Sequence, residues 1–320
     1  MALARFIVQR AAGGVVFALT VASLTLLLAR LAPGDATIVE GLAQTPAERA
    51  AMRAELGLDQ PLLTQYGRWL SGLTRFDFGR SSLFNRPVAD LLGQRALNSA
   101  LLALVALVIA TLVGIPLGRF TGASHGSLAR AVRGVSIAFL SVPPLLSALL
   151  FVFLAAETGW FPVGGMTSGD LTGLPWLTDL ARHLPVPVLA LALPLVATLE
   201  RVQSRAMAEA VGRPFVEASR ARGLTRERTL RVHAWPASLA PVLGIYGVLV
   251  GALFSGSFIV EMVTAWPGLG QLLFAGLSGR DVWLVAGCGA TGAVWLAVGT
   301  TVADVIHAAL DPRILERRRG

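Results

Sequence analysis

Lysine is absent from this 320-residue sequence, and all 27 of its basic residues are arginines. Phosphate-binding loops of the G-x-x-x-x-G-K-S/T type and Schiff-base enzymes both require a lysine. The absence therefore excludes ATP hydrolysis through such a loop, and it excludes lysine-based covalent catalysis.

Charged residues are scarce, at 14% of the chain against about 25% in a typical soluble domain. Six runs of about 20 residues carry no charge, and a helix of that length crosses a hydrocarbon core of about 30 Å. The composition therefore predicts an all-α integral membrane protein with six transmembrane helices, the fourth extending slightly beyond its run. Pro116, Pro143, Pro144 and Pro194 are expected to mark kinks or re-entrant turns. The six runs are residues 11–29, 97–118, 134–156, 184–199, 239–260 and 284–303.

Residue types that build metal or nucleophilic sites are few. Cys288 is the only cysteine and lies in the sixth run, which predicts a small buried apolar residue. Ser255 and Ser257 lack a G-x-S-x-G frame, so we expect them to serve helix packing. His125, His183, His233 and His307 lack the paired spacing of a zinc site. We predict no catalytic residue, no metal site and no cofactor bound by this chain.

The arginines indicate the orientation in the membrane, because positive charges flanking transmembrane helices stay on the cytoplasmic side. With the N-terminus inside, eight arginines between Arg201 and Arg231 lie in one cytoplasmic segment. The two short outer loops hold only Arg182 and Arg280, and the long outer segment 32–96 counts little in this rule. Both termini are therefore predicted to be cytoplasmic.

The first apolar run is predicted to be an uncleaved transmembrane helix, because it is longer than a signal-peptide core and lacks a small-x-small cleavage site. The formal net charge of +8 is explained by loop arginines that set the topology and contact anionic lipid. The lipid membrane is thus an expected partner, and nucleic acid is not.

Three acidic residues border the apolar runs: Glu200, Glu261 and Asp304. Ion-coupled carriers place an ionisable group near the middle of the bilayer. We expect these three residues at the membrane interfaces, with an arginine or a helix end as partner. A subunit of an ion-coupled secondary transporter stays open as an alternative function.

The segment 217–236 reads EASRARGLTRERTLRVHAWP and is dense in charge. Pro214 suits the first turn of a helix, Glu217 lies near its positive N-terminal end, and Gly223 can end it in a left-handed conformation. The pattern predicts a helix followed by a glycine turn.

A second helix is predicted to follow this turn. Thr225 can cap it, and Glu227 and Arg231 are spaced for an i,i+4 ion pair. Pro236 is expected to end this helix before the fifth transmembrane run. The product would be a rigid cytoplasmic unit joined to two transmembrane helices, suited to receive a push from a partner.

Glu217-Ala218-Ser219, with Gly223 after Arg220-Ala221-Arg222, resembles the E-A-A…G motif of ATP-binding-cassette importer permeases. Over nearly the whole chain, the sequence resembles the B-type inner-membrane permease subunit of the dipeptide/oligopeptide importer family. The supporting segments are LAPGD at 31–35, ELGLDQPL at 55–62, QY at 65–66, WL at 69–70, FDFGRS at 76–81, AWPGLG at 265–270, RD at 280–281 and LDPR at 310–313.

The resemblance implies a permease subunit of the bacterial inner membrane that forms half of a translocation path for peptides. It also implies a homologous C-type permease as heterodimer partner, two nucleotide-binding ATPase subunits that hydrolyse ATP with Mg²⁺, and an extracytoplasmic substrate-binding protein. A coupling helix at 214–223, within the cytoplasmic loop 201–238, would contact an ATPase. The residues assigned to this contact are Glu217, Ala218, Ser219, Arg220, Arg222 and Gly223.

Two departures from the family pattern lie in this loop. Ser219 replaces the second alanine of the motif, and Trp235-Pro236-Ala237-Ser238 stands where an arginine-asparagine pair is common. Pro236 therefore puts the junction with the fifth transmembrane helix in question.

The expected domains are an N-terminal tail with the first helix (1–31), a periplasmic subdomain (32–96) and a core permease domain (97–320). Aromatic residues in the subdomain are expected to anchor at the interface and to pack internally. We expect the binding protein to dock on this segment and on 263–283 together. The aromatic residues are Tyr66, Trp69, Phe76, Phe78 and Phe84.

The residues of this chain do not indicate which substrate is transported. The resemblance favours peptides, and the same architecture in relatives carries nickel chelates or glutathione. Selection is expected to reside largely in the separate binding protein.

Overall fold

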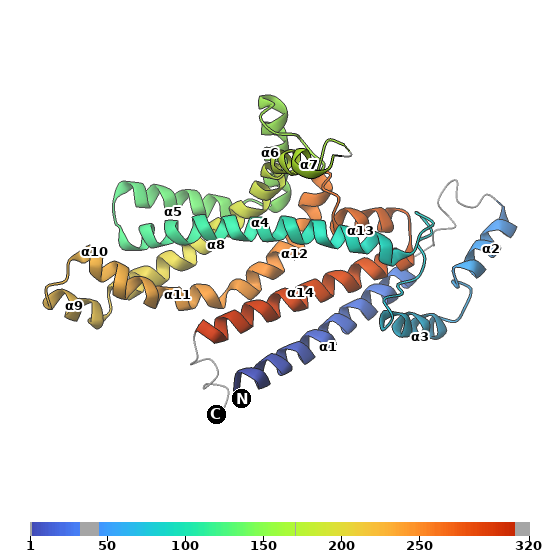
Figure 1. Cartoon of the computed structure of the whole chain (residues 1–320), viewed down its shortest axis with the longest axis horizontal. Coiled ribbons are helices and arrows are strands. Elements are labelled where there is room, and N and C mark those ends of the chain that lie inside the picture. Colours follow the sequence, from blue (N-terminus) through green and yellow to red (C-terminus); the bar gives the residue numbers. More distant parts are fainter. Residues whose placement is uncertain (1, 33–44, 170, 311–320) are drawn as a thin grey trace. The chain divides into compact units, whose positions relative to one another are not determined.

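A computed structural model describes residues 2–32, 45–169 and 171–310. Every regular element in these ranges is a helix, which confirms the all-α prediction. In chain order (Figure 1) they are α1 (Ala2–Leu31), α2 (Pro46–Glu55), α3 (Leu62–Leu73), α4 (Val88–Ala123), α5 (Ser127–Leu140), α6 (Pro144–Thr158), α7 (Gly173–His183), α8 (Pro185–Val211), α9 (Pro214–Ala221), α10 (Arg226–Thr229), the π-helical turn η2 (Leu230–Ala234), α11 (Trp235–Gly244), α12 (Tyr246–Val263), α13 (Leu269–Ser278) and α14 (Val282–Leu310).

Five helices in the described ranges are long and apolar enough to cross a membrane: α1, α4, α8, α12 and α14. A sixth candidate is the pair α5 and α6, which is bent by 107°. The number of predicted transmembrane segments is therefore met when the bent pair counts as one.

The expectation that Pro143 and Pro144 mark a kink or re-entrant turn in the run 134–156 is confirmed. Pro143 lies in the break after α5, and Pro144 is the first residue of α6. Proline lacks an amide hydrogen, and it disfavours helical backbone at the residue before it, so two in succession separate the helices. This run is a broken span or a re-entrant loop.

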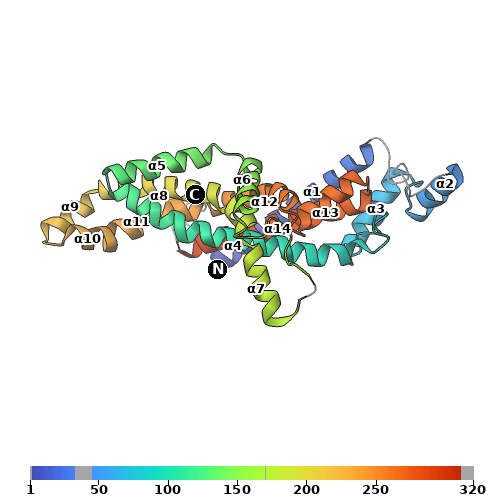
Figure 2. The same cartoon turned by 90° about the horizontal axis from the view of Figure 1, so that it is seen from above.

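The chain divides into two compact units. The first unit comprises residues 1–8, 101–264 and 299–320, and the second comprises 9–100 and 265–298. In the first unit, α8 packs against α5, α6 and α11 and is the most buried of the candidate spans. Figure 2 shows α5, α8 and α11 running alongside one another, with α9 and α10 at their end.

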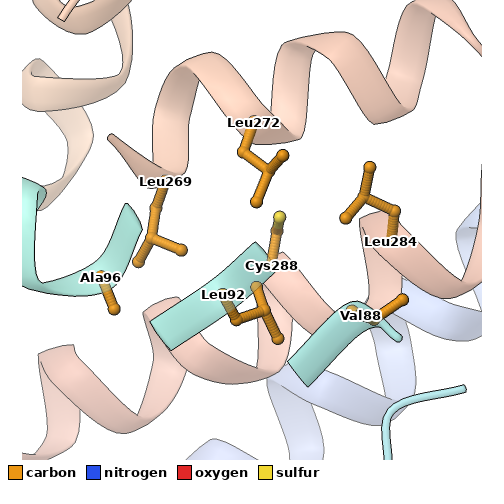
Figure 3. Close-up of a cluster of buried hydrophobic side chains, with 7 residues drawn as sticks. All are labelled: Val88, Leu92, Ala96, Leu269, Leu272, Leu284 and Cys288. Carbon is orange, nitrogen blue, oxygen red and sulfur yellow. The ribbon is translucent and has the colours of Figure 1, made fainter. Parts of the chain in front are cut away.

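The second unit is held by two apolar clusters. In one of them, Cys288 of α14 is 4% exposed and packs among leucines of α4 and α13, as Figure 3 shows. This confirms the prediction that Cys288 is a small buried residue. In the other, Trp69 of α3 packs against Leu26 of α1 and Ala286 of α14. The segment 45–100 is thus anchored on two transmembrane helices, and its residues 88–96 are already part of α4.

Candidate functional site

Helix α9 begins and ends where the sequence predicts. Arg213 is the extended N-cap residue, Pro214 occupies the first turn, and Glu217 is the acidic residue of that turn. Proline is preorganised for this position, and a carboxylate there interacts favourably with the helix dipole. Local rules therefore locate the start of this short helix.

Gly223 ends α9 in the left-handed conformation, with φ of +86°. Its N–H donates to the carbonyl of Arg220 at 2.9 Å, and the Leu224 N–H donates to the carbonyl of Ser219 at 3.3 Å. These two bonds form a Schellman motif, which satisfies carbonyls at the helix end. A Cβ on Gly223 would meet nothing within 4 Å, so glycine is needed here for its backbone angle and not for space.

Thr225 caps α10, as predicted. Its hydroxyl accepts a hydrogen bond from the Arg228 N–H at 3.4 Å. The predicted ion pair between Glu227 and Arg231 is wrong, because both side chains are exposed and no ion pair joins them in the described structure. Arg231 lies in the π-helical turn, where the wider spacing replaces the i,i+4 arrangement, and an exposed pair contributes little.

The prediction that Pro236 ends the second helix is also wrong. The π-helical turn η2 follows α10 directly, and α11 follows η2 with Pro236 in its first turn. The N–H of Trp235 donates to the carbonyl of Leu230, five residues back. This widened turn lies immediately before the proline, whose ring would clash with a carbonyl of a regular α-helix. The chain is therefore helical from Arg226 to Gly244.

One face of α9 is buried against the transmembrane helices. Val216 is 4% exposed and packs in a cluster with Met207 and Ala210 of α8 and Ala234 of η2. Ser219, three residues later, is 1% exposed, and its hydroxyl donates to the carbonyl of Phe215 at 2.7 Å. The short helix is thus fastened to both the helix before it and the helix after it.

Polar contacts reinforce this attachment. The Arg226 guanidinium donates to the carbonyl of Ala123, the last residue of α4, at 3.0 Å. The Arg119 guanidinium of α4 lies 5.1 Å from the ring centroid of Trp235. In addition, Gln203 of α8 donates to the Ser238 hydroxyl of α11 at 2.7 Å. These contacts join α10 to α4, and they join α11 to both α4 and α8.

Three glycines on α4 allow it to approach α8 closely. Gly114, Gly118 and Gly122 recur every four residues, and a Cβ on any of them would overlap atoms of α8. For Gly118, the added atom would be 2.5 Å from the backbone oxygen of Glu200. Small residues at this spacing permit close packing of membrane helices. Helices α4 and α8 are therefore in backbone-to-backbone contact along this stretch.

The partner of Glu200 is a threonine and not the expected arginine or helix end. Glu200 is 1% exposed, and its carboxylate accepts a hydrogen bond from Thr121 of α4 at 2.5 Å. Helix α8 continues past the charge-free run to Val211, so Glu200 lies inside the helix pair. Glu261 is likewise fully buried, on α12. No ion pair between an arginine and Glu200 exists in the described structure.

Two family sequence profiles match this chain. The profile of the family "Binding-protein-dependent transport system inner membrane component" matches residues 114–316, and its N-terminal companion, "Binding-prot-dependent transport system membrane comp, N-term", matches residues 3–111. The chain belongs to this family. It is thus a multi-pass inner-membrane component, and the family is one of membrane subunits without an ATPase domain.

Individual relatives are similar over most of their length. An oligopeptide transport system permease protein OppB of Mycobacterium tuberculosis is 35% identical over 270 residues, covering 81% of this chain and 82% of the relative. An oligopeptide transport system permease protein AppB of Bacillus subtilis is 29% identical over 316 residues, covering 98% and 99%. A protein of Brucella abortus, named for a peptide transport system permease, is 34% identical over 312 residues, covering 96% and 98%.

Six residues were assigned to the ATPase contact from the resemblance to this family, and they differ in their exposure to solvent. Five are exposed, and Ser219 lies on the buried face of α9. The spacing of Val216 and Ser219, one helical turn apart, was the signal for this inner face. An exposed neighbour, Phe215 at 37%, was not included. The five exposed residues are Glu217, Ala218, Arg220, Arg222 and Gly223.

The second unit holds another buried polar contact, between the loop 74–87 and the start of α14. Asp281 is 1% exposed, accepts a hydrogen bond from the Ser81 hydroxyl at 2.6 Å, and accepts another from the Leu83 N–H at 3.1 Å. Its other oxygen accepts from the N–H of Leu284 at 3.1 Å and so caps α14. The motif residues at 76–81 and 280–281 are therefore brought together.

The aromatic residues of the segment 45–87 divide into buried and exposed ones. Trp69 is buried, and the hydroxyl of Tyr66 lies 3.0 Å from that of Ser23 on α1. Phe78 packs against both apolar clusters of the second unit. Phe76 and Phe84 are 77% and 41% exposed. Internal packing is thus confirmed for three of the five, and two are available for an external contact.

Proposed function

We propose that this chain is the permease subunit of an ATP-driven importer of peptides, and that α9 with Gly223 is its coupling helix. The observation that carries the proposal is the two-faced burial of α9. Its outer face exposes a carboxylate and two guanidiniums, and its inner face packs on α8 and η2. Such a helix can receive a displacement and pass it to two transmembrane helices.

The proposed motion begins with the ATPase subunits, which bind and hydrolyse ATP with Mg²⁺. In this proposal, the permease chain itself binds neither ATP nor Mg²⁺. Closure of the ATPases displaces α9, and the packing of Val216 on Met207 and Ala210 carries the displacement to α8. The continuous helix from α10 to α11 carries it toward α12. The ATPases can switch the permease between its two states, which open to opposite sides of the membrane, only if their contacts with it differ in free energy between those states.

The proposed partners are a homologous C-type permease, two nucleotide-binding subunits and an extracytoplasmic binding protein. Membership of a binding-protein-dependent family supports the last two kinds of partner. The exposed Phe76 and Phe84 lie on the segment proposed to contact the binding protein. In this arrangement both termini are cytoplasmic and residues 45–87 are periplasmic, in keeping with the distribution of the arginines.

Peptides are the proposed substrate because the similar proteins named above belong to peptide or oligopeptide transport systems. Uptake of labelled di- and oligopeptides into cells with and without this gene tests the assignment. Labelled glutathione and a nickel chelate are measured alongside. Loss of uptake of one of these two, with peptide uptake unchanged, would show that the cargo assignment is wrong.

The coupling assignment is tested with Glu217→Arg, which reverses a charge on the exposed face of α9. Glu157→Arg is the matched control, because Glu157 is also exposed and lies in the last turn of α6, a helix that does not pack against α9 or α10 in the described structure. Solubilised complexes are purified from the native host, and their partners are identified by mass spectrometry. We expect wild type and Glu157→Arg to retain the ATPases and the second permease.

Glu217→Arg is expected to retain the permease partner and to lose the ATPases. Retention of both ATPases with undiminished transport would overturn the role of Glu217. If the wild-type chain carries out transport without any ATPase, an ion-coupled carrier becomes the better account. Dissipating the proton and sodium gradients while ATP is maintained then separates the two mechanisms.

A further inference from the structure

The first unit contains a cavity of about 260 Å³ between α5 and α8. Three of its lining residues are arginines, and one, Glu200, is an acid. The lining residues are Arg133, Ile137, Glu200, Arg201, Ser204, Arg205 and Ala208. The cavity therefore has an excess of positive charge in a small volume.

The arginines around this cavity lack acidic partners. Arg201 and Arg205 are one helical turn apart on α8, and neither forms an ion pair or hydrogen bond within the described ranges. Like charges at this spacing repel each other. Among the residues that the structure describes, Arg133 donates only two long hydrogen bonds, to the carbonyls of Ala129 at 3.3 Å and Ser124 at 3.4 Å. An anion among the three guanidiniums would remove this repulsion.

Ser204 supplies a second, independent indication of a ligand. It is 7% exposed and lines the cavity, yet its hydroxyl has no hydrogen-bond partner among the described residues. Serine in a helix commonly donates to the carbonyl four residues back. An unpartnered, nearly buried hydroxyl next to guanidiniums is suited to bind a phosphate oxygen.

We propose that this cavity binds the phosphate group of an anionic phospholipid. The cavity follows the charge-free stretch of α8, which places it at the depth of lipid headgroups. Its wall also includes Ile137 of α5, which is 54% exposed. The guanidiniums contact the headgroup, and the Ile137 side chain contacts the acyl chains. Basic pockets between transmembrane helices on the cytoplasmic side bind such headgroups.

The experiment uses the full-length chain in mixed micelles of phosphatidylglycerol and phosphatidylcholine, with bound lipids counted by native mass spectrometry. We compare wild type with the double variant Arg201→Gln/Arg205→Gln. A guanidinium that donates directly to the phosphate contributes roughly tenfold, so we expect about 100-fold less retained phosphatidylglycerol in the double variant. Retention of phosphatidylcholine is expected to stay the same.

Arg130→Gln is the matched control, because Arg130 is an exposed arginine of α5 that does not line the cavity. It is expected to retain phosphatidylglycerol within about twofold of wild type, since only cavity arginines contact the headgroup. Arg201→Lys/Arg205→Lys preserves the charge and is expected to retain most of the lipid. Ser204→Ala, which removes no charge, is expected to retain about fivefold less.

Three results would overturn the proposal. The first is equal retention of the two lipids by wild type, and the second is an equal loss in Arg130→Gln. The third is displacement of phosphatidylglycerol by millimolar inorganic phosphate, which would identify a free anion as the ligand. If the double glutamine variant fails to fold, Ser204→Ala and the double lysine variant decide the question. The assay contains no ATPase, so its outcome is independent of the proposed coupling contact.

Discussion

Gly118→Ala tests whether α4 and α8 form a rigid pair. The new Cβ would lie 2.5 Å from the backbone oxygen of Glu200 and 2.6 Å from the Cβ of Gln203. Neither atom can move without shifting α8, because one is backbone and the other is the first side-chain carbon. Overpacking of this kind costs about 1–3 kcal/mol. We therefore expect Gly118→Ala to lower the unfolding midpoint of the solubilised chain, measured by fluorescence-detected size exclusion after heating.

Gly93→Ala is the control on the same helix. A Cβ at Gly93 meets nothing within 4 Å, and alanine is a better helix former than glycine by up to about 1 kcal/mol. The midpoint of Gly93→Ala should equal or exceed that of wild type. The close-packing argument is refuted if Gly118→Ala is as stable as wild type, or if Gly93→Ala loses as much stability as Gly118→Ala.

Two further predictions concern the ends of short helices. In Gly223→Ala, the alanine must adopt the left-handed backbone conformation of Gly223, which costs about 1–2 kcal/mol of stability. Hydrogen exchange of the α9 amides should therefore become roughly five- to thirtyfold faster. Gly212→Ala, at an ordinary φ of −83°, should leave these rates unchanged, and equal rates in both variants would contradict the assignment. The backbone N–H of Ser168 donates to Oδ2 of Asp179 at 2.6 Å, and this hydrogen bond lowers the pKa of the Asp179 carboxyl. The contact therefore stabilises the fold fully above the ordinary pKa of about 3.9, and this stabilisation is lost as the pH falls through the lowered pKa. The protection factor of the Ser168 amide, which compares its exchange with that of an unstructured peptide at the same pH, should therefore fall on acidification in wild type, and Asp179→Asn should show no such fall.

Residues governed by neighbours in the chain were predictable from sequence. Charge-free runs located the transmembrane helices, since burying charge in lipid is costly, and Gly223 and Thr225 were identified from local capping rules. The predictions for Pro236 and for the partner of Glu200 failed because their outcomes depend on neighbouring backbone and on another helix. A π-helical turn accommodates the proline, and Thr121, 79 residues away, satisfies the carboxylate.

The candidate site was only partly visible in the sequence for a related reason. The motif specified which residue types occur on α9, but not which of them face the transmembrane helices. The burial of Ser219 follows from contacts of α9 with α8 and η2, which lie outside the motif. The arginine-lined cavity was equally hidden, since Arg133 is far in sequence from Arg201 and Arg205.

The π-helical turn at Leu230–Ala234 accommodates one extra residue within the helix that runs from α10 to α11. Because a π turn holds one residue more than an α turn, deleting a residue there would restore regular helix and leave the residues beyond it in nearly the same orientation. Ser238 would then still face Gln203, and that buried amide would keep its partner. The same deletion within the regular helix α8, before Gln203, would rotate everything beyond it by about 100° and turn Gln203 away from Ser238.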